Sequence, residues 1–155
     1  MTRGAGSRAR AEPATSTIVK PAAQGWSSRR TPVSTSNIAL FEAAYQAYVE
    51  RGDLDVFYRT LDPDVEWRAW NDEGNCHGRD EVMAVIRSAL DSGLAVEVPP
   101  HVDAGDKLVL MPREMPPFFP PDADGLFQVV EIRDGTIVAI RDFIHRDDAM
   151  AAAGL

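Results

Sequence analysis

The stretch LFQVVEIRDGTIVAIRDFIH, Leu126 to His145, decides the fold of this chain. It consists of two runs rich in Val, Ile and Phe, separated by Asp134-Gly135. Asp-Gly between such runs strongly favours a tight turn, so the stretch predicts a β-hairpin.

Two loop lengths fit this hairpin, and they bring different faces together. A two-residue loop places Gln128 on the face of Arg141, whereas a three-residue loop with a bulge at Gly135 places it on the face of Asp142. We favour the three-residue loop because it makes one face almost wholly apolar. That face consists of Leu126, Gln128, Val130, Ile132, Val138, Ile140, Asp142 and Ile144.

The opposite face of the predicted hairpin mixes charged and apolar side chains. Such a face is typical of a subunit interface, because exposed apolar residues on a sheet usually contact a partner. Its members are Glu131, Arg133, Ile137, Ala139, Arg141, Phe143 and His145.

Composition describes an ordinary globular protein of one domain, with 155 residues, 45% apolar and 26% charged. No apolar run approaches the ~20 residues that span a bilayer, so we expect no membrane partner. Cys76 is the only cysteine, which excludes an intrachain disulfide and indicates a reducing, cytoplasmic environment.

Charge is distributed unevenly along the chain. Residues 1–36 hold six Lys/Arg and one Glu, while residues 37–155 hold ten Lys/Arg and 23 Asp/Glu. The acidic body argues against nucleic acid as a partner. The segment 1–36 lacks a hydrophobic period, which predicts a disordered extension or a misassigned start before a domain at 37–155.

Hydrophobic periodicity and turn residues predict the elements of the body. Helices are expected at 37–51 with Ser36 as N-cap, from Asp53 to a stop at Pro63, at 79–91 and at 146–153. Strands are expected at 65–70, 95–98 and 107–111 and in the hairpin, with loops at 71–78 and 112–125. Helices followed by strands predict an α+β fold, a curved, mostly antiparallel sheet with about three helices on one face.

This order of elements resembles the cone-shaped, cystatin-like fold shared by nuclear transport factor 2, ketosteroid isomerase, scytalone dehydratase and the SnoaL-type polyketide cyclases. The resemblance covers about residues 37–155. Four short motifs carry it: Tyr45 seven residues before Gly52-Asp53-Leu54-Asp55, then Leu61-Asp62-Pro63-Asp64-Val65, His77-Gly78-Arg79, and Asp134 to Val138 followed by Arg141-Asp142-Phe143. It implies a sheet curved into a cone with the helices on its concave side, although the fold hosts enzymes, ligand binders and interaction domains alike.

The resemblance also assigns candidate site residues. Tyr45 stands where ketosteroid isomerase has its oxyanion-hole tyrosine, and Gln128 stands at or next to the place of the partner aspartate. Ala69 aligns with the catalytic base and cannot accept a proton, so steroid isomerisation by that mechanism is not expected. The SnoaL-type cyclases carry an acid on the last strand, as this chain carries Asp142.

Each candidate has a structural alternative. Asp142 either projects into the cone as a base of raised pKa, or is solvated or paired with Arg68 or Arg141. Gln128 either bonds a ligand carbonyl or satisfies nearby backbone groups, and Tyr45 is either catalytic or core. The predicted pocket is lined by Trp67, Phe57, Ile140, Met83 and Phe118.

Cys76-His77 is either a nucleophilic pair or, as we favour, a loop pair without function. The three histidines and the lone cysteine share no ligand spacing, so no metal site is expected.

Two functions follow from these residues. The first is binding of a small, apolar, carbonyl-bearing ligand, with isomerase, cyclase or dehydratase chemistry that needs no cofactor. There Asp142 would be the base, and Tyr45 and Gln128 would donate hydrogen bonds to the oxyanion.

The second function is that of a non-enzymatic binder or dimerisation module, a homodimer through the sheet. A cavity on the order of several hundred Å³ that exposes Asp142 would favour the first function. A cone filled by Trp67, Phe57 and Met83 would favour the second.

Overall fold

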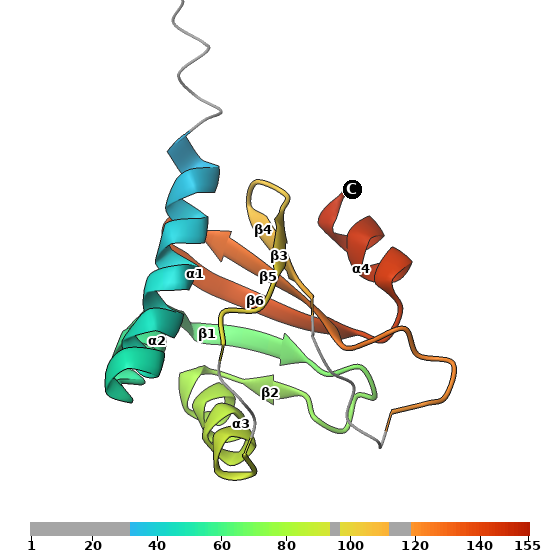
Figure 1. The fold of residues 1–155 in the computed structure, drawn as a ribbon, viewed down its shortest axis with the longest axis horizontal. Helices are drawn as coiled ribbons and strands as arrows, with labels where there is room; N and C mark the ends of the chain where they lie inside the picture. The colour runs from blue at the N-terminus through green and yellow to red at the C-terminus, as the bar shows by residue number, and fades with distance from the viewer. Residues whose placement is uncertain (1–31, 94–96, 112–118) are drawn as a thin grey trace, which may run out of the picture.

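The computed structural model describes residues 32–93, 97–111 and 119–155, which form four helices and one curved, unclosed sheet of six strands (Figure 1). The sheet has the order β2-β1-β6-β5-β4-β3, in which β1 and β6 are parallel and all other neighbours antiparallel. The predicted α+β class is confirmed. The elements are α1 (Pro32–Arg51), α2 (Asp55–Thr60), β1 (Leu61–Arg68), β2 (Cys76–His77), α3 (Arg79–Asp91), β3 (His101–Asp103), β4 (Lys107–Leu110), β5 (Phe127–Arg133), β6 (Thr136–Phe143) and α4 (Arg146–Ala153).

The β5–β6 hairpin contains both registers that the sequence allowed. At its tip, Asp134 and Gly135 both have positive φ, +49° and +75°, and form a two-residue loop. This is the type I′ geometry that suits the twist of paired strands. The register then shifts between Glu131 and Ile132, and the rest of the hairpin pairs as predicted, with Gln128 opposite Asp142.

A bulge at Val138 accounts for this change of register. Ile132 pairs with Ile137 and Glu131 with Ala139, so Val138 is the extra residue. The favoured three-residue loop with a bulge at Gly135 is therefore wrong: the loop has two residues, and the bulge lies three positions later. Because an extra residue exchanges the faces of the strand, Ile137 lies in the core at 1% exposure and Val138 is only half-buried.

Strand β1 starts at Leu61, four residues earlier than predicted, and it includes Pro63, which was expected to end α2. Between the pairs Leu61–Ile137 and Glu66–Ala139, β1 carries three more residues than β6. The Asp62 carboxylate accepts a hydrogen bond from the Asp64 N–H at 2.9 Å within this irregular part. Proline is tolerated at such a bulge because no ladder bond is required of it.

The helices agree with the sequence best where both ends carry a signal. The bounds of α3 and α4 are those predicted, whereas α1 begins at Pro32, so Ser36 lies inside the helix and is not its N-cap. Proline suits a first helical turn because the N–H it lacks would have no partner there. The buried face of α1 includes Phe41, Ala44 and Ala47, while Val49, predicted in the stripe, is 55% exposed.

Two segments were assigned wrongly because their pairing is long-range. The loop predicted at 71–78 contains the two-residue edge strand β2, which pairs with β1. The strand predicted at 95–98 is not formed at residues 97 and 98; β3 lies just beyond the two prolines and pairs with β4. None of the described helices is both long and apolar enough to cross a membrane.

The two faces of the sheet are packed by different helices. Residues of α1, α3, β1, β4, β5 and β6 form the main core, and Figure 1 shows α4 apart from the other helices. On the other face, Ala149 and Ala153 of α4 pack with Val109, Phe127 and Val129. The second face of the hairpin is therefore partly covered within the chain: Phe143 packs against α4, and Ile137 belongs to the main core.

Candidate functional site

Asp142 is the centre of a polar cluster on the face of the sheet that holds the main core. Its Oδ1 atom accepts two hydrogen bonds, from Trp67 Nε1 at 3.0 Å and from Gln128 Nε2 at 3.0 Å. Gln128 lies directly opposite Asp142 on β5, and Trp67 of β1 pairs with Ile140, two residues before Asp142. Alternation along the strands therefore places all three polar groups on one face.

The environment raises the pKa of Asp142 to about 6, from an ordinary value of 3.8. Burial is the main cause, because a carboxylate loses solvation when it is enclosed, and the hydrogen bonds from Gln128 and Trp67 act in the opposite direction. A carboxyl with this pKa holds and releases a proton near neutral pH, which is the property a general acid or base requires.

The second oxygen of Asp142, Oδ2, accepts no hydrogen bond from the described residues. No fully enclosed side-chain nitrogen or oxygen in the described part of the chain lacks a partner. Oδ2 is therefore the oxygen of Asp142 that no described group occupies.

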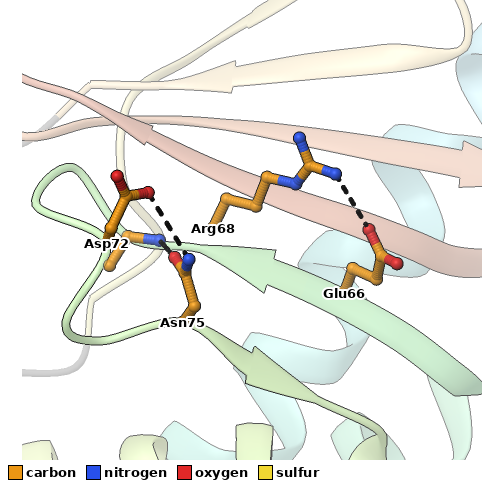
Figure 2. A network of polar contacts seen from close by, with 5 residues as sticks. Glu66, Arg68, Asp72 and Asn75 are labelled. Carbon is orange, nitrogen blue, oxygen red and sulfur yellow. Dashed lines mark hydrogen bonds and ion pairs between the residues drawn. The ribbon is translucent and has the colours of Figure 1, made fainter.

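Asp142 lies beside the position where the resemblance placed a missing carboxylate. β1 and β6 are parallel and pair Arg68 with Arg141, so the next residues along, Ala69 and Asp142, are neighbours. The predicted alternative for Asp142, an ion pair with an arginine, is not formed among the described residues. Arg68 lies 3.6 Å from Glu66 (Figure 2), and the side chain of Arg141 is exposed.

Both backbone and side-chain hydrogen bonds hold the turn after β1. Figure 2 shows Asn75 next to Asp72: the Ala69 N–H donates to Asn75 Oδ1 at 2.9 Å, and Asn75 Nδ2 donates to Asp72 Oδ1 at 3.4 Å. A Cβ placed on Gly74 would lie 2.9 Å from the Cβ of Ala69. The turn thus packs closely on Ala69, and a longer side chain at position 69 would displace the turn.

Tyr45 is placed in the core and not in the hydrogen-bonded cluster. Its ring packs against Phe41 and Phe57 at centroid distances of 4.7 and 6.2 Å. Burial raises the pKa of its phenol, and its hydroxyl makes no hydrogen bond with the described residues.

The predicted pocket residues lie around the same core. Met83 and Ile140 are fully buried, and Phe57 and Trp67 are half-buried against them. Phe118 lies outside the described residues. Sequence reasoning gave Trp67 only a packing role, although an inward tryptophan needs a partner for its indole N–H and so signals a nearby acceptor.

Cys76 lies on β2 opposite Trp67, not in a loop as predicted. Burial raises the pKa of its thiol, and the carboxylates of Glu81 and Asp142 raise it further. A thiol held protonated is a poor nucleophile, and the His77 side chain is exposed. The raised pKa of the thiol argues against a nucleophilic role for Cys76-His77.

Two cavities can be described from residues that the structure places, and Asp142 lines neither of these two. One is an open groove of about 280 Å³ at the β1–β2 edge; it is lined by Glu66, Trp67, Arg68, Asn75, Cys76, His77 and Glu81. The other, of about 90 Å³, lies between the sheet and α4; it is lined by Lys107, Val129, Glu131, Ala139, Arg141 and Ala152. Trp67 thus connects the first groove with the carboxylate.

Comparison with protein families gives a match to the SnoaL-like domain over residues 41–140. The matched segment contains Tyr45, Trp67 and Gln128 and ends two residues before Asp142. No curated protein matches the chain.

Solved structures share the fold at low identity. An NTF2-like protein of unknown function from Burkholderia pseudomallei is 20% identical with a TM-score of 0.51, covering 77% of this chain and 98% of its own. A protein from Jannaschia named as a SnoaL-like polyketide cyclase is 17% identical with a TM-score of 0.53, covering 80% and 95%. TerC, co-crystallised with polyporic acid, is 15% identical with a TM-score of 0.52, covering 77% and 99%. These similarities support the cone fold alone.

Proposed function

The chain belongs to the SnoaL-like domain family, and on that basis we propose that it binds a small, mostly apolar carbonyl compound. We further propose that it acts as an isomerase, cyclase or dehydratase without a cofactor, with Asp142 as the base. The observation that carries the proposal is the partly buried Asp142 carboxyl, held by two N–H donors and with a pKa of about 6.

The chemistry is proton transfer next to a carbonyl group. Asp142 takes a proton from the carbon beside the carbonyl, and the electron pair moves onto the carbonyl oxygen. The proton is then returned to another atom of the substrate or follows a leaving group. Tyr45 is the proposed donor to the oxyanion, because it stands where the resemblance places that donor and its hydroxyl makes no hydrogen bond with the described residues.

Gln128 has a different role from the one expected from the sequence. Its amide donates to Asp142, so it holds the base in place, and only its second N–H is left for a ligand.

A screen for ligands followed by an exchange assay tests this function. Polyketide-like, steroid-like and terpenoid-like carbonyl compounds are first screened by thermal shift. Each hit is then incubated in D₂O, and NMR measures deuterium incorporation at the carbon beside the carbonyl. We expect Asp142→Asn to slow this exchange about 100-fold or more, because it removes the base and keeps its shape.

Asp148→Asn is the matched control, since it removes an exposed carboxyl of α4 and should leave exchange unchanged. Exchange by Asp142→Asn at the wild-type rate would exclude Asp142 as the base.

A non-enzymatic binding or dimerisation module is the second candidate, and one observation favours it. Met83 is buried in the main core with Phe57 and Trp67 packed against that core, and Asp142 lines neither of the two cavities described above. For this candidate, the sheet face beside α4 would be the surface for a second copy, and sedimentation velocity measures whether a dimer forms. A dimer that binds carbonyl compounds without exchanging their protons would support the module over the enzyme.

A further inference from the structure

We propose that Trp67 is a positioning residue for Asp142: together with Gln128 it fixes the carboxylate through Oδ1 and leaves Oδ2 as the atom that accepts the proton. The proposal deepens the acid-base role above and rests on it for its functional meaning. Its structural content is independent, because it concerns which oxygen of Asp142 is held and by which groups.

The geometry supports this division between the two oxygens. Trp67 Nε1 and Gln128 Nε2 each lie 3.0 Å from the same atom, Oδ1, and they approach from the two strands that flank β6. A carboxylate gripped on one oxygen from both sides cannot rotate about its last bond without breaking two hydrogen bonds. The free oxygen therefore points in a fixed direction, which is what a base needs to meet a bound substrate.

Trp67 suits this role better than a more flexible donor would. Its ring is half-buried against the main core, and its strand is locked to β6 by the pair Trp67–Ile140. The indole N–H is a donor only, so it bonds the carboxylate and never competes with it for a proton. Tryptophan also has few rotatable bonds, so little rotamer freedom is lost when it is held.

The groups around Asp142 leave its charge without a cationic partner among the described residues. On β2 the neighbouring titratable group is the Cys76 thiol, whose pKa the charge of Asp142 helps to raise, and a thiol carries no positive charge. On β1, Arg68 pairs with Glu66, and on β6 the side chain of Arg141 is exposed. Two neutral donors, rather than a salt bridge, therefore hold the carboxylate, which leaves it basic enough to take a proton.

Titration of the Trp67 indole by NMR tests the proposal without a substrate. The chain has three tryptophans, so the indole ¹H–¹⁵N region of the full-length protein has few signals. The signal that disappears in Trp67→Phe is that of Trp67. We expect the Trp67 signal to move with a midpoint near pH 6 as Asp142 ionises, and to stop titrating in Asp142→Asn. A Trp67 signal that does not titrate in the wild type, or that titrates unchanged in Asp142→Asn, overturns the proposal.

A second measurement follows the carboxyl itself. We expect Trp67→Phe to raise the pKa of Asp142 by roughly one unit, as the ¹³C shift of its carboxyl would show, because a donor that favours the charged form is lost. Trp70→Phe is the matched control: Trp70 packs on Phe119 at 5.3 Å and should leave this pKa unchanged. An equal pKa in Trp67→Phe and wild type contradicts the proposal. If Trp67→Phe does not fold, Trp26→Phe and Trp70→Phe assign the Trp67 signal by elimination, and the indole titration then decides.

The two proposals fail in different ways. If Trp67 titrates with Asp142 but no carbonyl compound exchanges its protons, the positioning stands and the enzymatic function fails. If exchange depends on Asp142 and the Trp67 signal does not titrate, the function stands and the positioning fails. With an active substrate, Trp67→Phe should move the acidic limb of the pH profile of kcat/KM to higher pH, which a loss of packing alone would not do.

Discussion

Near the Asp134-Gly135 turn, the β5–β6 hairpin presents Ile132 and Ile137 to the main core, whereas near its other end the same face presents Gln128 and Asp142. The two isoleucines are 2% and 1% exposed, and their side chains belong to the main apolar core. Gln128 and Asp142 are half-buried and hydrogen-bonded to each other.

The difference between these two ends shows how one hairpin serves two requirements. Burying Ile137 stabilises the fold at any pH, while enclosing an ionised Asp142 opposes folding near neutral pH. The bulge at Val138 allows both ends to face the same side. A residue that lowers stability inside an otherwise consistent core is characteristic of a functional site.

Deleting Val138 should prevent the two ends of the hairpin from facing the same side of the sheet. Without the extra residue, either Ile137 or the pair Ile140 and Asp142 must turn to the other face of the sheet. We expect a loss of at least about 4 kcal/mol in the free energy of unfolding, or no cooperative transition, measured by urea denaturation. Val138→Ala keeps the bulge and should cost about 1 kcal/mol, so an equally small loss for the deletion would show that the register shift is dispensable.

Replacing Ile137 by Ala probes the apolar end. The side chain is fully buried, so we expect a loss of about 2–5 kcal/mol from lost burial and the cavity left behind. Urea denaturation at pH 5 and pH 8 should give the same loss, because no charge is involved. A loss that changed strongly with pH would mean that the two ends of the hairpin are coupled.

Replacing Asp142 by Asn probes the polar end, and we expect the opposite sign. The pKa of Asp142 is about 6 in the folded protein against an ordinary 3.8, so the folded state binds this proton more tightly. The resulting stabilisation is fully present below about pH 4 and is lost as the pH rises through about 6.

Asn keeps both accepted hydrogen bonds and has no charge to bury. Asp142→Asn should therefore match the wild type near pH 4 and be about 1–2 kcal/mol more stable at pH 8, a value reduced because the carboxyl is partly exposed. Thermal unfolding across this pH range measures the difference, with Asp148→Asn as the exposed control. Destabilisation at pH 8 would show that the charge itself holds the native cluster together.

Much of the fold was predictable where the signals are local. The Asp134-Gly135 turn and the bounds of α3 and α4 follow from residues close to each other in sequence. The pairing of Gln128 with Asp142 was also predicted, because one face of the hairpin had to be apolar.

The errors arose where distant partners decide the structure. The early start of β1 and the edge strand β2 depend on pairing with other strands, which no local pattern shows. The hydrophobic pattern predicted the register of the hairpin correctly between Phe127 and Glu131. It could not locate the bulge, because Ile137 and Val138 are equally apolar. The coverage of the second face by α4 likewise depends on packing after the hairpin has formed.

The sequence by itself determined that this chain folds as a curved α+β sheet and that an amide and a carboxylate share its apolar face. Only the tertiary structure decided what that carboxylate is bonded to. Trp67 is 75 residues away from Asp142 along the chain, and their contact requires that β1 pair in parallel with β6. Periodicity assigns a side chain to a face, whereas the pKa of a carboxyl depends on which donors and how much solvent meet it there.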